Sequence, residues 1–427
     1  MKTLLHFLII LNLFAQTSFG QISDSLTVPE SNILDLDFLI VEAMQNNPDI
    51  RAASFEWDMF RAKIPQSNSP ASPELSVMQE DMPGFDPGDA MFTRVELMQM
   101  FHYPGKLQLM GELAHIQSEH SHHDHLEKIN DVIGTLKKMY AELWYVQQLH
   151  TLNRENARLM KQMLSIAQTK FGTGEIAQQE INKIRIEINM LDNQLIELRQ
   201  KELSAKSMLM SILNRTKNDT LGFAVISEEI IFIPSLDKLH ALALINRPML
   251  KHDSLGIHEG QTMLAMAKKQ YYPDFNVGLE YLHSPMTGEN GWSISAGITL
   301  PFAPWSIGKA DAQVQEASIA IDKSKAMLNA TQNMVRSTVD DLYYKIQSSQ
   351  LQMKNFSSGI LPQARSSLEN NLVAYQNGRT NYLMLIDSYR LLVDLTKEYY
   401  MLRMNFEQTL SELDKETGVQ NVARFEN

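Results

Sequence analysis

The 427-residue sequence contains no cysteine, which excludes disulfide bonds, thiolate metal sites and a lipid-bearing N-terminal cysteine. It also lacks a run of about 18 consecutive apolar residues beyond its N-terminal segment, so we expect no transmembrane helix. Positive charge is scarce, because the net charge is −12, and this disfavours a nucleic-acid partner. Any part that crosses a membrane must then be a closed β-barrel, in which strand pairing satisfies every backbone group.

Motifs of the common enzyme classes are missing as well. The sequence has no His-Glu-x-x-His, no Gly-x-Ser-x-Gly and no phosphate-binding loop. Gly172-x-Gly174 stands alone, without the strand-to-helix context of a nucleotide-binding turn. We therefore expect no enzymatic activity and no cofactor.

The N-terminus has the features of an export signal. Lys2 precedes an apolar run from Leu4 to Phe14, and the small residues Ser18 and Gly20 follow it. This pattern predicts a cleavable signal peptide over residues 1–20 and a mature chain that lies beyond the inner membrane.

The remaining chain contains an internal duplication. Four short motifs recur in the same order about 200 residues later, which predicts a tandem structural repeat. The pairs are Asn46-Asn47-Pro48 with Asn246-Arg247-Pro248, Pro73-Glu74-Leu75 with Pro273-Asp274-Phe275, Gly105-Lys106 with Gly308-Lys309, and Phe171-x-x-Gly174 with Tyr375-x-x-Gly378. We expect a first repeat over 21–215, a linker over 216–234, a second repeat over 235–418 and a tail over 419–427.

Each repeat has the same order of predicted elements. A helix comes first, over 35–63 and again over 236–270, where apolar residues recur with helical spacing. A two-stranded β-hairpin follows, over 73–103 and 273–302, where the apolar period changes to two. A long helical hairpin ends each repeat, over 105–213 and 306–417, and Pro362 interrupts the second one.

Four strands per chain are too few for a membrane barrel, because the smallest such barrels have about eight. Several chains must therefore contribute if the hairpins enter a membrane. The alternative from periodicity alone is a soluble coiled coil, and the interposed hairpins argue against it.

These features together resemble the TolC family of outer-membrane efflux proteins, over nearly the whole mature chain. The resemblance implies a mainly α fold with a small β part: a homotrimer whose hairpins form a 12-stranded β-barrel in contact with outer-membrane lipid, continued into the periplasm by an α-helical barrel. It also implies a passive export conduit that works with a periplasmic adaptor protein and an inner-membrane pump, of the RND type.

The resemblance further implies a periplasmic gate at the helix tips. By position, Tyr375 matches a gate tyrosine, Asp387 an inward-facing gate aspartate and Glu180 an acidic partner. Where the family has a gate arginine, this chain has Thr380, with Arg379 one place earlier, so we expect a rearranged gate. The alternative is that Asp387 and Glu180 are ordinary solvated charges on helix surfaces.

A histidine cluster bears on the cargo. If the segment is helical, its spacings allow imidazole and carboxylate groups to meet one zinc or copper ion. The cluster consists of His115, His120, His122, His123 and His125. Its alternative interpretation is a set of solvated polar residues on an exposed helix.

We expect a channel for heavy-metal cations, similar to the outer-membrane members of copper/silver or cobalt/zinc/cadmium systems. Two alternatives remain open: a conduit for drugs or for type I secretion, and a non-transporting periplasmic coiled-coil protein that binds metal.

Overall fold

The computed structural model describes residues 33–420, apart from 83, 85, 88–89, 217–220, 228–232, 286 and 302. The predicted signal peptide, the predicted strand end at Phe302, most of the predicted tail and part of the predicted linker therefore lie outside the described residues.

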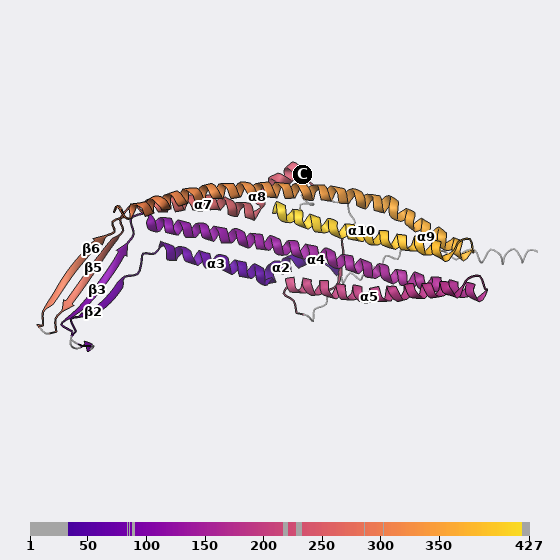
Figure 1. Cartoon of the computed structure of the whole chain (residues 1–427), viewed down its shortest axis with the longest axis horizontal. Helices are drawn as coiled ribbons and strands as arrows, with labels where there is room; N and C mark the ends of the chain where they lie inside the picture. Colours follow the sequence, from indigo (N-terminus) through magenta and orange to yellow (C-terminus); the bar gives the residue numbers. More distant parts are fainter. Residues whose placement is uncertain are drawn as a thin grey trace, which may run out of the picture.

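Helices dominate an elongated molecule and run along its length (Figure 1). The longest, α4, has 67 residues and therefore extends over about 100 Å. The helices are α2 (Leu36–Asn46), α3 (Pro48–Asn68), α4 (Lys106–Gly172), α5 (Gln178–Ile212), α6 (Leu236–Asn246), α7 (Pro248–Lys269), α8 (Ile307–Asn355), α9 (Leu361–Gln376) and α10 (Tyr382–Thr417).

The strands form one four-stranded sheet at one end of the molecule (Figure 1) and one short parallel pair. The sheet has the order β2-β3-β5-β6 and is antiparallel throughout, so the pairing of β3 with β5 joins the two hairpins. Its strands are β2 (Glu74–Glu80), β3 (Phe92–Phe101), β5 (Phe275–His283) and β6 (Asn290–Ile298), and the short pair is β1 (Ile33–Leu34) with β4 (Phe223–Ala224).

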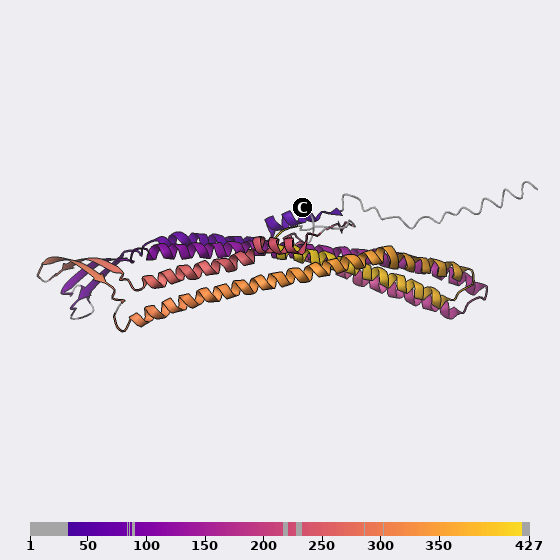
Figure 2. The ribbon, with the colours of Figure 1, turned by 90° about the horizontal axis from the view of Figure 1, so that it is seen from above.

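The helices form a curved layer that is one helix thick (Figures 1 and 2). Next to the sheet, α7 lies between α4 and α8, and α3 packs on the other side of α4. Toward the far end, α4 and α10 are central and are flanked by α5 and α9. Such a layer buries side chains between neighbouring helices and leaves both of its surfaces open.

The predicted first helix of each repeat is in fact two helices. Residues 35–63 and 236–270 were each expected as one element, but α2 ends before Asn47-Pro48 and α6 ends before Arg247-Pro248. The residue before a proline is sterically driven out of the helical region, and both Asn47 and Arg247 are extended. Each proline then begins the next helix, where its missing N–H is no loss.

Pro362 perturbs the second long helix without ending it. A single π-helical turn, Phe356–Ile360, lies between α8 and α9, and the proline occupies the first turn of α9. The wider turn accommodates the missing backbone donor, so the helical path continues to the tip.

Candidate functional site

The sheet has two chemically different faces. Strand register aligns Leu75, Leu97, Leu279 and Ile294 in one row across all four strands, so these side chains lie on one face. The neighbouring row contains Val77, Val95, Tyr281 and Trp292. Most of these side chains are exposed, and Ile294 is 81% exposed. A contiguous apolar surface of this kind marks a contact with lipid or with another protein.

The opposite face of the sheet is more polar and carries the glutamates of the four strands, although Met78, Met98 and Leu282 also lie on it. One of its rows runs across the four strands and contains Ser76, Glu96, Glu280 and Ser293, which lie side by side. Arg94 on the same face pairs with Glu280 at 3.5 Å. Alternation of apolar and polar residues on opposite faces is typical of strands between lipid and a water-filled lumen.

In the part of the chain that the structure describes, no helix is both long and apolar enough to cross a membrane.

The helix tips at the end opposite the sheet are formed by two equivalent turns (Figure 1). Gly174 and Gly378 have φ angles of +78° and +70°, which a glycine adopts without strain. Backbone N–H groups in both turns donate to the same relative carbonyls, for example Glu175 to Lys170 and Arg379 to Ala374. The recurring aromatic-x-x-Gly motif is thus a helix C-cap.

The tips bring two predicted gate residues together. The hydroxyl of Tyr375 donates to Glu180 Oε2 at 3.5 Å, which joins the two repeats. Tyr375 is only 2% exposed, and Lys170 Nζ lies 5.6 Å from its ring centroid. Burial and the Glu180 carboxylate raise the pKa of Tyr375 to about 12, so this phenol stays protonated.

The other two predicted gate residues lie apart from this pair. Arg379 and Asp387 are both exposed. Among the described residues, neither side chain forms a hydrogen bond or ion pair with Tyr375 or Glu180. The gate assignment of all four residues remains a prediction.

The tips also contain groups that the sequence reasoning missed. Arg390 pairs with Glu187 across the two helical hairpins, and this hydrogen bond raises the pKa of Arg390. Tyr382 is buried beside them, and burial followed by the Glu187 charge raises its pKa to about 12. Glu187 follows Glu180 by seven residues, and Tyr382 follows Tyr375 by the same number. This heptad spacing could have predicted that the second glutamate and the second tyrosine lie on the same helix faces as the first.

The predicted histidine cluster lies on α4, where its side chains point in different directions. His122 and His125 pack against Trp57 of α3, with ring centroids 4.3 and 6.3 Å away. His115 is exposed. Burial, followed by the nearby His122, lowers the pKa of His123 and therefore favours its neutral form.

Within the described residues, no three His, Asp or Glu side chains are placed to share one metal ion. The imidazole and carboxylate groups of the histidine cluster therefore do not form a ready-made metal centre in this part of the chain. Metal binding by the cluster remains a prediction.

Two histidines of α7 face α4, and the sequence reasoning missed both. His252 lies 4.3 Å from His120 between ring centroids, and His258 approaches Glu112 at 3.5 Å. More than 130 residues separate the partners along the chain. Local spacing therefore held no signal for these contacts.

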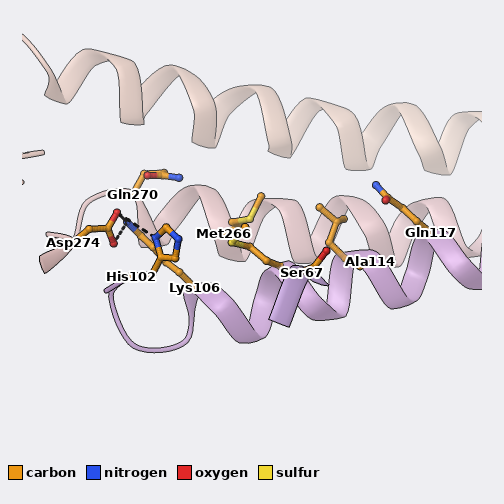
Figure 3. A pocket seen from close by; sticks show the side chains of 10 residues that line it. Ser67, His102, Lys106, Ala114, Gln117, Met266, Gln270 and Asp274 are labelled. Carbon is orange, nitrogen blue, oxygen red and sulfur yellow. Dashed lines mark hydrogen bonds and ion pairs between the residues drawn. The ribbon is translucent and has the colours of Figure 1, made fainter. Parts of the chain in front are cut away.

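A buried ion pair fastens the helices to the sheet (Figure 3). Lys106, the first residue of α4, reaches both carboxylate oxygens of Asp274 at 3.0 Å, just before β5. The backbone N–H of Tyr103 donates to the same carboxylate at 2.7 Å. His102 lies 3.8 Å from it, and the group lines a cavity of about 410 Å³ between α4 and α7. Because the pair belongs to both repeats, it fixes their junction.

Comparison with known proteins gives a consistent family. The family model for outer membrane efflux proteins matches residues 39–215 and again 239–419, which together make up most of the chain. The cobalt-zinc-cadmium resistance protein CzcC of Cupriavidus metallidurans is 20% identical over 391 residues, which are 90% of each chain.

Solved structures share the fold at low identity. CusC superposes with a TM-score of 0.77 at 16% identity, over 90% of this chain and 92% of that one. The open-state outer membrane channel MtrE of Neisseria gonorrhoeae gives a TM-score of 0.75 at 14% identity, over 90% and 89% of the two chains. The resemblance to TolC-family channels is thereby confirmed, and the chain belongs to the outer membrane efflux protein family.

Proposed function

We propose that this efflux channel is the outer-membrane component of a three-part system that exports heavy-metal cations from the periplasm. In this proposal the signal peptide over 1–20 is removed, the sheet spans the outer membrane and the helices extend into the periplasm. The two-faced sheet at the end of the helical layer carries the proposal, because its exposed apolar face suits lipid and its acidic face suits a water-filled lumen.

Assembly from three identical copies supplies what one chain lacks. The edges of the sheet are β2 and β6, so pairing β6 of each copy with β2 of the next copy closes the twelve strands of three copies into a barrel. The edges of the helical layer also need neighbouring copies to cover them. Its outer helices expose apolar residues with heptad spacing, Ile196 and Leu203 on α5 and Tyr344 and Leu351 on α8.

Three observations support a metal cargo. The relative CzcC is named as a cobalt-zinc-cadmium resistance protein. The polar face of the sheet carries Glu74, Glu80, Glu96 and Glu280 against the single Arg94, which favours cations in the lumen. The third observation is the histidine cluster near the start of α4, whose members we propose as transient ligands: His115, His120, His122, His123 and His125.

The tips are the proposed gate and docking surface. Tyr375 and Glu180 hold the two hairpins of one chain together. Arg379 and Asp387 are exposed and therefore free to meet neighbouring copies or a partner. We propose that a periplasmic adaptor docks here and connects the channel to an inner-membrane pump of the RND type, which supplies the energy.

A drug or type I secretion conduit is the second candidate, because the fold alone is shared with channels such as MtrE. A non-transporting coiled-coil protein fits less well, since it would leave the apolar face of the sheet in water.

Growth of a deletion strain tests the proposal. The strain is compared with its parent on copper, silver, zinc, cobalt and cadmium, and on a panel of hydrophobic drugs and dyes. We expect selective sensitivity to one metal group, restored by the plasmid-borne gene. Sensitivity to drugs with unchanged metal tolerance would replace the proposed cargo with the second candidate.

A further inference from the structure

Four side chains alternate across the contact between α4 and α7, which we call the α4–α7 seam. Glu259 Oε2 lies 3.5 Å from His120 Nε2, and the His120 ring lies 4.3 Å from that of His252. His252 Nε2 in turn lies 3.7 Å from Asp124 Oδ1. The order is carboxylate, imidazole, imidazole, carboxylate, with one imidazole and one carboxylate from each helix.

We propose that His120 and His252 bind one divalent transition-metal ion across the α4–α7 seam, with Glu259 orienting the His120 ring and Asp253 orienting the His252 ring. The proposal deepens the metal cargo proposed above and rests on it.

The chemistry of the ring nitrogens points to a ligand. Both ring nitrogens of His120 are buried, and among the described residues neither has a hydrogen-bond partner. A buried nitrogen of this kind is unfavourable unless something occupies it. Nε2 of the same ring lies 3.5 Å from Glu259 Oε2, and a metal-binding histidine usually has its second nitrogen held by a carboxylate in this way. In His252, Nδ1 lies 3.4 Å from Asp253 Oδ1, so Nε2 is the nitrogen left for the ion.

The geometry needs only a small adjustment. With metal–nitrogen distances of about 2.1 Å, two imidazoles at a tetrahedral angle hold their ring centres roughly 5 Å apart. The present separation is 4.3 Å with the rings 66° from parallel, so a slight opening of the seam admits an ion. The side chain of His252 is 37% exposed, which gives the ion access from solvent.

The seam supplies two direct protein ligands. This number agrees with the finding that, in the described residues, no three His, Asp or Glu side chains are placed to hold one metal ion. Water completes the coordination, as in sites with open positions. An ion held in this way exchanges readily, which suits a cargo in transit more than a structural metal.

The chain offers a matched control. His258 of α7 also faces a carboxylate of α4, Glu112, at 3.5 Å. Unlike His252, it has no second imidazole paired with it among the ring contacts of the described residues. His258→Ala therefore removes a seam histidine without removing the proposed ligand pair.

The test uses the full-length protein without a polyhistidine tag, in a background in which four other α4 histidines become glutamine. Those four are His115, His122, His123 and His125. Zn²⁺ binding is measured by calorimetry, and Co²⁺ binding by its visible ligand-field absorption, with circular dichroism as the check on folding.

We expect one ion per chain in this background, and the same affinity in His258→Ala. His252→Ala should weaken binding by more than about tenfold, and Glu259→Gln, which keeps both imidazoles, by about ten- to a hundredfold. Absence of binding in the background, or affinity unchanged within about twofold in a folded His252→Ala protein, would overturn the proposal.

This readout is independent of the proposed function. Binding that is lost in His252→Ala supports the seam site even if the deletion strain keeps its metal tolerance, which would count against the cargo alone. Metal sensitivity of the strain without any binding at the seam would reject the site and leave the proposed function standing.

Discussion

The ion pair between Lys106 and Asp274 should dominate the stability of the junction between helices and sheet. Only 7% of the Lys106 side chain and 16% of that of Asp274 are exposed, and the ammonium reaches both carboxylate oxygens at 3.0 Å. Removing one partner of a buried pair leaves the other charge uncompensated, which destabilises by about 3–5 kcal/mol. Lys106→Met leaves the carboxylate with the Tyr103 N–H and a neighbouring His102, so we expect the lower end, about 3 kcal/mol.

Urea unfolding of the detergent-solubilised protein, followed by circular dichroism and tryptophan fluorescence, measures this loss. The duplication provides the control, because Lys309 occupies the corresponding position of the second repeat and is exposed. Lys309→Met should change the free energy of unfolding by less than about 0.5 kcal/mol.

A double variant separates the pair from its surroundings. Lys106→Met with Asp274→Asn removes both charges, so it should be more stable than the sum of the single effects predicts, by at least about 1 kcal/mol. A Lys106→Met protein as stable as Lys309→Met, or additive single effects, would refute the reasoning.

Four further outcomes are expected. Gly378→Ala should lower stability by roughly 1–2 kcal/mol in thermal unfolding, because alanine is strained at a φ of +70°. Ile294→Lys should weaken membrane assembly by about 2–4 kcal/mol, as judged by the fraction recovered in outer membranes, while Ser295→Lys on the opposite face should not. Neutral Tyr375, whose pKa is raised to about 12, contributes stability that should persist below a pH of about 10 and be lost as the pH rises through about 12. In pH-dependent unfolding, Tyr375→Phe should reduce this loss, and the part that remains comes from Tyr382, whose pKa is also raised to about 12. Asp387→Ala should lower the preference for cations over anions in bilayer recordings, and an unchanged preference would make Asp387 an ordinary surface charge.

Much of the architecture was readable because it rests on local periodicity. The alternation from Phe275 to Tyr281 predicted a strand, and the structure places β5 there. The glycine of each aromatic-x-x-Gly motif marked the end of a long helix, and both glycines adopt positive φ at the tips.

The errors arose where one local rule overrode another. Helical periodicity continues through Asn47-Pro48, so the segment read as one helix. The steric demand of the proline on Asn47 decided the break. In the second repeat, Pro248 has the same effect on Arg247 and separates α6 from α7.

Contacts between distant elements could not be predicted from one sequence. Nothing in the spacing of the α4 histidines indicates that His252 lies against His120, because that contact depends on α7 lying beside α4. The ion pair of Lys106 with Asp274 likewise depends on the pairing of β3 with β5. For Tyr375 and Glu180, the family resemblance supplied the candidates, and packing of the two helical hairpins brought them together.

Engineered cysteines show whether three copies of the sheet close one barrel. The natural chain has no cysteine, so single replacements at the sheet edges, such as Val77→Cys on β2 and Ile294→Cys on β6, introduce the only thiols. A set of such β2–β6 pairs is oxidised in intact outer membranes, and the products are separated by mass. We expect cross-linked dimers and trimers and nothing larger, and we expect them only when both cysteines are present. A ladder that continues beyond three chains, or no cross-link in any register, would contradict a barrel of three copies.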